Sequence, residues 1–197
     1  MLFGYDTGVI NGALRPMAAE IGLDAFTEGV VTSSLVFAAA FGALFGGRIS
    51  DAIGRRRTII ILAVLFFLGT VVVVASPNFA LLVVGRIMLG LAVGGASTVV
   101  PVYLAELAPF EIRGSITGRN EVAIVTGQLS AFVINAILGN TLGHVDGVWR
   151  IMFAVCAIPA ICLFFGMLRM PESPRWLVEK GRHADALAVL KTVRSEE

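Results

Sequence analysis

Long stretches without a charged residue constrain this chain more than any other feature of its sequence. Five such stretches cover Gly29–Gly47, Thr58–Gly85, Ile87–Ala105, Val122–Val145 and Ile151–Leu168. A helix needs about 20 mostly apolar residues to cross the roughly 30 Å apolar core of a bilayer, and each stretch meets or approaches that length. The chain is also 57% apolar and 15% charged, whereas soluble domains are about 45–50% apolar and about 25% charged. These features predict an all-α membrane protein.

The apolar pattern predicts six transmembrane helices joined by short turns. We expect them near residues 2–14, 27–47, 58–76, 80–105, 120–140 and 150–169. The first segment, from Leu2 to about Leu14, is too short to span a bilayer. It has no basic region before it and contains Asp6, so it is not typical of a signal peptide. We interpret it as the outer part of a helix whose beginning is missing.

Lysine and arginine are distributed unevenly over this predicted topology. Arg15 and Arg150 fall on one side, Arg86 falls within a span, and twelve basic residues fall on the other side. Those twelve are Arg48, Arg55, Arg56, Arg57, Arg113, Arg119, Arg169, Arg175, Lys180, Arg182, Lys191 and Arg194. Because cytoplasmic loops are enriched in basic residues, we expect the side with twelve to be cytoplasmic, together with the carboxyl end of the chain.

The carboxyl-terminal segment has a different character. The motif PESPRW at residues 171–176 ends the last span, and apolar residues then recur at helical spacing among charges. This pattern predicts a cytoplasmic amphipathic helix from about Pro174 to Arg194. The chain therefore divides into a transmembrane bundle over residues 1–170 and a cytoplasmic helical segment over residues 171–197.

No pattern typical of an enzyme or a metal site occurs in the sequence. Cys156 and Cys162 lie six residues apart on one apolar span, so they face away from each other, and we interpret both as packing residues. Residues 90–95 (GLAVGG) are glycine-rich, but no strand precedes them, as a dinucleotide-binding loop requires. We therefore expect no enzymatic activity, no metal, no cofactor and no nucleic-acid partner.

Asp6 and Arg86 are the two charges that lie within apolar spans. Ionisable groups inside a membrane are costly, and they usually face a bundle interior or an aqueous cavity and pair with another group. Counting along the helices places both at a similar depth, about 12 Å and about 9 Å from the outer helix ends. We predict that they form a pair that takes up and releases a proton when the contact breaks and reforms. A purely structural ion pair is the alternative.

The fifth predicted span has a polar face. Glu121, Gln128 and Asn135 are seven residues apart, a spacing that keeps them on one side of a helix, with Ile124 between the first two. Polar groups in a bilayer need partners, so this face should point inward. Side-chain amides donate and accept hydrogen bonds and suit hydroxyl-rich ligands. Hydrogen bonding between helices is the alternative role.

The loop GRISDAIGRRR at residues 47–57 joins two spans. Positive-inside charge explains its arginines, including Arg48 and Arg55, but it does not explain Gly47, Asp51 or Gly54. The glycines and the acid predict a tight turn, with Asp51 near a helix end and available to basic neighbours.

These motifs together resemble the sugar porter family of the major facilitator superfamily. The resemblance rests on FGYDTGVINGA at 3–13, GRISDAIGRRR at 47–57, GR at 85–86, PVYLAELAP at 101–109 with RG at 113–114, GQ at 127–128 and PESPRW at 171–176. The segment NEVAIVTGQ at 120–128 is most similar to bacterial proton-coupled hexose and inositol porters. The fold class that this implies is the six-helix amino-terminal bundle of a twelve-helix transporter, followed by the cytoplasmic amphipathic helix.

The resemblance also implies roles for individual residues. Asp6 matches the acid that proton-coupled members carry on the first helix, and Arg86 matches its partner on the fourth. Gln128 matches a sugar-binding glutamine, and Phe3, Glu121 and Ile124 fall at neighbouring cavity positions. A charged cytoplasmic network that holds the two halves of the transporter together is matched by Arg48, Asp51, Arg55, Glu106, Arg113, Glu172 and Arg175, with Gly47 and Gly54 in the same turn.

The predicted function is proton symport of a sugar or polyol by alternating access, in a bacterial cell membrane. The implied partners are the substrate, the lipid bilayer and a carboxy-terminal half that this chain lacks, and the proton gradient takes the place of a cofactor. A facilitative sugar uniporter is the nearest alternative, and Asp6 argues against it. A membrane sensor or assembly subunit that does not transport is the alternative from another class.

Overall fold

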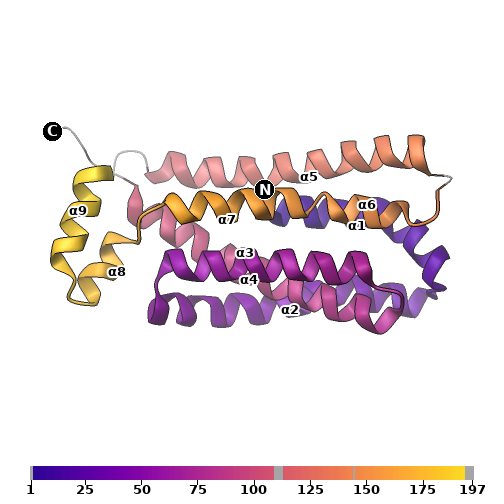
Figure 1. Ribbon diagram of the computed structural model, residues 1–197, viewed down its shortest axis with the longest axis horizontal. Coiled ribbons are helices and arrows are strands. Elements are labelled where there is room, and N and C mark those ends of the chain that lie inside the picture. Colours follow the sequence, from indigo (N-terminus) through magenta and orange to yellow (C-terminus); the bar gives the residue numbers. More distant parts are fainter. Residues whose placement is uncertain (1, 109–112, 144, 194–197) are drawn as a thin grey trace.

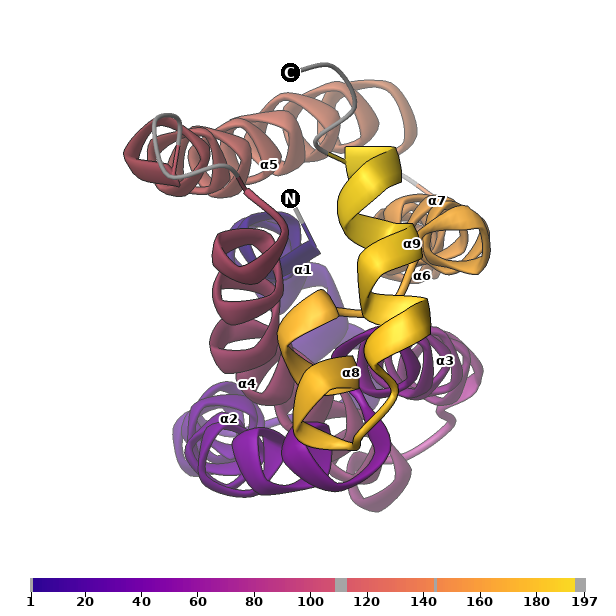
Figure 2. The same cartoon turned by 90° about the vertical axis from the view of Figure 1, so that its left-hand side faces the viewer.

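The structure is a computed structural model that describes residues 2–108, 113–143 and 145–193. Within these residues every regular element is an α-helix: α1 (Leu2–Ile21), α2 (Ala25–Ile53), α3 (Arg55–Ala75), α4 (Phe79–Leu107), α5 (Arg113–Leu142), α6 (Val148–Ala154), α7 (Ala157–Arg169), α8 (Pro174–Glu179) and α9 (His183–Val193). Helices α1–α7 run roughly along the long axis of the molecule, and we call them the bundle (Figure 1). Helices α8 and α9 lie together across one end of the bundle (Figure 2). The predicted all-α fold is confirmed.

The length and composition of the bundle helices suit a membrane. Five segments are long and apolar enough to cross a bilayer: Ala25–Ile53, Arg55–Ala75, Phe79–Leu107, Gly114–Leu142 and Val148–Arg169. These match five of the six predicted spans. Large apolar side chains also point outward, as Phe37 does with 70% of its surface exposed. Such residues are ordinary where lipid, rather than water, covers a helix.

Helix α1 differs from its prediction at the carboxyl end. A turn was expected to begin near Arg15, but the helix continues through Pro16 to Ile21. Proline at this position removes one hydrogen bond and does not stop the helix. The turn occurs at Gly22, whose φ of 74° favours glycine. With 20 residues, α1 is about 30 Å long. In Figure 1 this helix begins near the middle of the long axis of the molecule.

Helix α2 begins with a capping box. The Asp24 carboxylate accepts a hydrogen bond from the Thr27 backbone N–H, and the Thr27 hydroxyl accepts one from the Asp24 backbone N–H, each at 2.8 Å. These bonds satisfy amide groups that have no partner within the helix. The hydrogen bond from the Thr27 backbone also lowers the pKa of the Asp24 carboxyl. Local hydrogen bonding therefore fixes the short turn between α1 and α2.

Glycines allow α2 and α4 to pack with their backbones close together. A Cβ added at Gly94 would lie 1.9 Å from the Ala39 carbonyl oxygen, and one added at Gly90 would lie 2.3 Å from that of Leu35. Gly42 approaches the Leu91 carbonyl oxygen in the same way, at 2.3 Å. Small residues at such positions are typical of membrane helix pairs.

The sixth predicted span consists of two helices. Helix α6 ends at Ala154 and α7 begins at Ala157. Pro159 explains the break, because it has no N–H to donate to the carbonyl of Val155. The Val155 carbonyl instead accepts a bond from Ile158 N–H at 3.1 Å.

The carboxyl-terminal segment also consists of two helices, so the prediction of one amphipathic helix from Pro174 to Arg194 is wrong. Helices α8 and α9 are separated at Gly181, whose φ of 74° breaks the helix. Trp176, Leu177 and Ala186 form a small buried cluster between them. Arg194 lies outside the described residues.

Candidate functional site

Asp6 on α1 and Arg86 on α4 form an ion pair in the interior of the bundle. The Asp6 Oδ1 and Arg86 Nη1 atoms are 3.3 Å apart, and the two side chains are 1% and 2% exposed. The structure therefore brings together the two charges that the sequence placed within apolar spans. Removing two charges from water is costly, and the attraction between them seldom exceeds that cost by much.

Several polar atoms around this pair have unused hydrogen-bonding capacity. In the described part of the chain, Asp6 Oδ2, Arg86 Nε and the Tyr5 hydroxyl are buried without a hydrogen-bond partner. Arg86 instead lies against an aromatic ring, with its Cζ 5.7 Å from the centroid of Phe153. Buried polar atoms are normally paired. A single hydrogen bond thus links the two charges, and the remaining polar atoms of both groups are free to bind another partner.

The polar face of α5 contains two different environments. Asn135 is buried, and its Nδ2 donates to the carbonyls of Gly8 at 3.4 Å and Val9 at 3.0 Å on α1. Asn135 therefore bonds one helix to the other, which was the alternative role considered for this face. Gln128 is half-buried on the same face, and no hydrogen bond of its side chain occurs within the described residues. Its amide remains available to a ligand.

A cavity of about 640 Å³ opens among α1, α3, α4, α5 and α7. Phe3, Glu121 and Ile124 line it, so three of the four predicted substrate residues lie together. Gln128, Asp6 and Arg86 are not part of its lining. Most other lining residues are apolar, from Ile59 and Phe66 to Val100 and Leu163. A ligand rich in hydroxyl groups needs more hydrogen-bonding partners than this lining offers, so the cavity is not by itself a sugar site.

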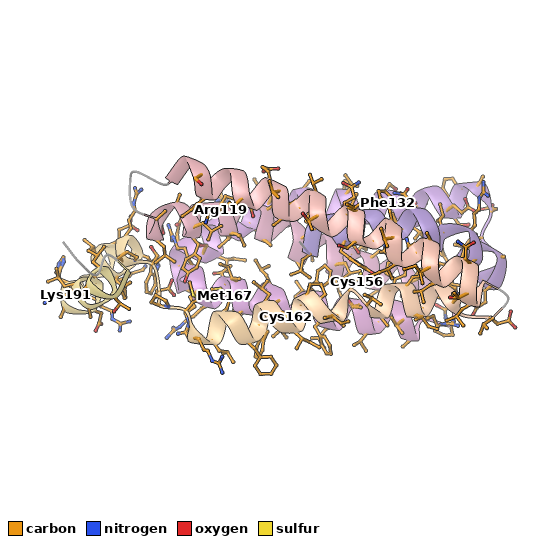
Figure 3. All side chains as sticks on the ribbon, turned by 90° about the horizontal axis from the view of Figure 1, so that it is seen from above. Arg119, Phe132, Cys156, Cys162, Met167 and Lys191 are labelled. Carbon is orange, nitrogen blue, oxygen red and sulfur yellow. The ribbon has the colours of Figure 1, made fainter. Side chains whose placement is uncertain are left out.

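Sequence reasoning missed two polar residues of this cavity, Ser97 and Asn120. Asn120 directly precedes Glu121 in a segment that had been recognised, whereas nothing in the local pattern distinguishes Ser97. Cys162 also lines the cavity and is exposed, while Cys156 is buried. The interpretation as a packing residue therefore holds for Cys156 and is wrong for Cys162. Figure 3 shows both along α6 and α7, with Cys162 nearer to Met167.

Near α8 and α9, Arg55 is the centre of a second charged cluster. Its guanidinium contacts Asp51 Oδ1 at 2.7 Å and Glu106 Oε2 at 3.2 Å, and it donates to the Ser50 carbonyl at 3.1 Å. Ser173 donates from its hydroxyl to Glu106. Arg55 and Glu106 are each 7% exposed at their side chains, so this pair is buried. The cluster ties α2, α3 and α4 to the start of α8.

Glu172 completes this cluster through backbone groups. Its Oε1 accepts hydrogen bonds from the backbone N–H groups of Arg56, at 2.9 Å, and Ser173, at 3.0 Å. Gly54, with a φ of 105°, lies so close that an added Cβ would be 2.5 Å from Glu172 Oε2. This close approach explains the glycine in the turn between α2 and α3.

Four hydrogen bonds at this end were not predicted from the sequence. Arg56 donates to the carbonyls of Met167 at 3.0 Å and Leu168 at 2.7 Å. The Tyr103 hydroxyl donates to the carbonyl of Pro171 at 2.6 Å, and Trp176 Nε1 donates to that of Asp51 at 3.0 Å. In all four, a side chain donates to a backbone carbonyl, and a pattern of charges in the sequence does not reveal such acceptors.

Other residues assigned to this network lie apart from it. Arg48 is exposed and makes no ion pair within the described residues, and Arg175 pairs with Glu179 at 3.6 Å in an exposed position. Gly47 has no neighbour within 4 Å of an added Cβ, so close packing does not explain it. The Arg113 side chain lies outside the described part of the chain. Arg48 and Arg175 therefore make no contact with the Arg55 cluster within the described residues, and their place in a network between the two halves stays a prediction.

Comparisons with known proteins identify the family. The model of the family "Sugar (and other) transporter" matches residues 1–197. The chain is 58% identical to the major myo-inositol transporter IolT of Bacillus subtilis, covering all of this chain and 42% of that protein. It is 41% identical to the human proton myo-inositol cotransporter, covering all of this chain and 30% of that protein.

Among solved structures, the chain is similar to XylE, which is described as a proton:xylose symporter of the major facilitator superfamily. The TM-score is 0.90 at 33% identity, over 98% of this chain and 46% of that one. The chain thus spans less than half the length of each of these three proteins. It belongs to the sugar (and other) transporter family of the major facilitator superfamily.

Proposed function

We propose that the complete protein carries a sugar or polyol across a membrane together with a proton, and that the Asp6–Arg86 pair is the coupling site. The buried pair is the observation that carries the proposal. It joins a carboxylate to a guanidinium through one hydrogen bond at 3.3 Å, inside a bundle of membrane-length helices. Intramembrane ion pairs of this kind are typical of proton pathways in transporters.

The substrate class is supported by the family. Two relatives with full coverage of this chain are named as myo-inositol transporters, and XylE is named as a xylose symporter. A polyol or sugar presents hydroxyl groups, and the half-buried Gln128 amide offers a matching donor and acceptor. Phe3 and Glu121 lie at the cavity of the same bundle, and we assign them to the edge of the substrate site.

The proposed orientation of the bundle in the membrane follows from the positions of its basic residues. The end with Arg55, Arg56 and Arg57 also carries α8 and α9, and we assign it to the cytoplasm of the cell, together with the carboxyl end. In this orientation the turn at residues 76–78 faces outward. The charged cluster around Arg55 then lies at the cytoplasmic mouth, where it can hold or release a partner half as the transporter changes conformation.

Substrate-driven proton movement in the complete protein tests this function. Reconstituted in liposomes with an internal pH indicator, the protein should show an internal pH change when myo-inositol, glucose or xylose is added outside. A symporter carries protons inward with the substrate, so the lumen should acidify. Substrate uptake without any pH change would instead indicate a uniporter. Binding without uptake would indicate a sensor.

A further inference from the structure

A third polar cluster lies at the end of the bundle opposite to α8 and α9. One Glu20 carboxylate oxygen, at the end of α1, accepts a hydrogen bond from Trp149 Nε1 at 2.8 Å, and the other pairs with Arg150. Arg150 also donates to the Ser76 carbonyl at 3.1 Å, and its Cζ lies 4.5 Å from the Trp149 ring centroid. We call Glu20, Ser76, Trp149 and Arg150 the Glu20 clamp.

The Glu20 clamp joins three elements that are distant in sequence. Glu20 belongs to α1, Ser76 directly follows the last residue of α3, and Trp149 and Arg150 lie in the first turn of α6. Asp6 lies on α1, one of the helices held in this way, and Arg86 lies on α4, which follows α3 after the turn at Ser76. Charge-assisted hydrogen bonds such as these are stronger than neutral ones. The clamp therefore fixes the end of α1, the helix that carries Asp6, against α6 and the end of α3.

A continuous chain of contacts leads from the Glu20 clamp to the ion pair. The Trp149 and Phe153 rings, one helical turn apart on α6, meet edge to face with centroids 6.4 Å apart. Phe153 in turn lies under the Arg86 guanidinium, at 5.7 Å from its Cζ. Trp149 and Phe153 are both fully buried. Since a single hydrogen bond holds Arg86 to Asp6, packing against Phe153 sets where the guanidinium lies.

We propose that the Glu20 clamp and Phe153 position Arg86 against Asp6. They touch no reacting group, so they are positioning residues, and the inference rests on the proposed coupling role of the pair. When the clamp opens, α6 moves away from α1 and α3, and Phe153 no longer supports Arg86. Coupling between proton and substrate then weakens, while the substrate site on α5 remains intact.

Cys156 provides a readout that needs no substrate. It follows Phe153 by three residues and is 1% exposed, so a thiol reagent reaches it only when α6 moves. In the complete protein with Cys162→Ser, Glu20→Ala should raise the labelling rate of Cys156 about tenfold, because the clamp loses two charge-assisted bonds. Glu20→Gln keeps an acceptor for Trp149 Nε1, so its rate should fall between those of Glu20→Ala and the parent.

Coupling is the second readout, measured as the ratio of uphill accumulation to exchange of substrate. Glu20→Ala should lower this ratio. Val99→Ala, in the separate core cluster with Ile59 and Tyr103, serves as the control for general destabilisation. It should lower the melting temperature and leave both readouts unchanged. Glu179→Ala, in the exposed pair with Arg175, should change nothing.

The inference is overturned if Glu20→Ala leaves either readout unchanged, or if Val99→Ala changes both to the same extent. Labelling of Cys156 does not depend on transport. A protein that moves no sugar would therefore contradict the proposed function and still report whether the clamp holds α6.

Discussion

Gln128 and Asn135 show that the surroundings of a residue determine its role. Both are amides on one face of α5, seven residues apart. Asn135 is buried against α1 and donates to two of its carbonyls, whereas the Gln128 side chain is half-buried and makes no hydrogen bond within the described residues. The same chemical group is thus used for packing at one position and is free for a ligand at the other.

This difference predicts opposite effects for two matched substitutions. Gln128→Ala should weaken binding of myo-inositol or a hexose by about 1–3 kcal/mol, or roughly 5- to 150-fold, because ligand hydroxyls lose their partner. Its melting temperature should stay near that of the parent protein. Isothermal titration and thermal unfolding of the purified complete protein measure both quantities.

Asn135→Ala should show the reverse pattern. Loss of the bonds to the Gly8 and Val9 carbonyls should destabilise the bundle by about 0.6–1.7 kcal/mol, the range typical of hydrogen bonds between membrane helices. Affinity in the folded fraction should be unchanged. Unchanged binding in a well-expressed Gln128→Ala protein would remove Gln128 from the substrate site, and Glu121 would lose support with it.

Among the elements, α2 and α4 depend most on close backbone contact. Gly94→Ala places a methyl group 1.9 Å from the Ala39 carbonyl oxygen, so the helices must separate, at a cost of about 1–3 kcal/mol or more. Gly29→Ala, on α2 with nothing within 4 Å, is the control and should be neutral or slightly stabilising. Thermal unfolding measures both changes. Equal melting temperatures for the two variants would show that α2 and α4 are not packed as described.

The charged cluster between α2, α3, α4 and α8 predicts a similar contrast. Arg55→Ala leaves the buried Glu106 carboxylate without its partner, which should cost about 3–5 kcal/mol. Arg175→Ala removes an exposed arginine whose pair with Glu179 spans 3.6 Å, so little change is expected. Expression and melting temperature of the complete protein give the comparison. A mild effect of Arg55→Ala would mean that other groups stabilise Glu106.

The helices could be predicted from the sequence because each apolar stretch is long enough to identify a span by itself. Helix ends were harder to predict. Arg15 and Pro16 are typical of a turn, yet packing carries α1 past them to Ile21. The break at Gly181 was missed because apolar residues keep their helical spacing across it.

In the candidate site, too, some features could be predicted from the sequence and others depend on packing. Asp6 and Arg86 could be paired from the sequence, since two charges at similar depth in apolar spans have few other partners. The backbone acceptors of Arg56 and the position of Phe153 under Arg86 depend on tertiary packing. Sequence patterns identify charges, but they do not show which carbonyl or ring lies beside them.

At the scale of the whole molecule, the orientation in the membrane is the first prediction. We expect Arg56 and Lys191 to be cytoplasmic and Asn78 to face outward, because twelve basic residues fall on one side and two on the other. Single cysteines at these positions, in a protein without Cys156 and Cys162, can be labelled in intact cells with an impermeant reagent. Labelling at position 56 but not at 78 would reverse the proposed orientation.

The central claim is that Asp6 couples substrate movement to a proton. Asp6→Asn keeps the size of the side chain and its ability to hydrogen-bond to Arg86, but it removes the group that titrates. Asp185→Asn, in the exposed pair with Arg182, is the matched control and should behave as the parent protein does.

The most direct measurement compares uphill accumulation with exchange in liposomes that contain the complete protein. With Asp6→Asn, a proton gradient should no longer concentrate the substrate, while exchange of labelled for unlabelled substrate across the membrane should continue. Exchange requires binding and conformational change but no net proton transfer, so it separates coupling from folding. An Asp6→Asn protein that still accumulates substrate against its gradient would contradict the account.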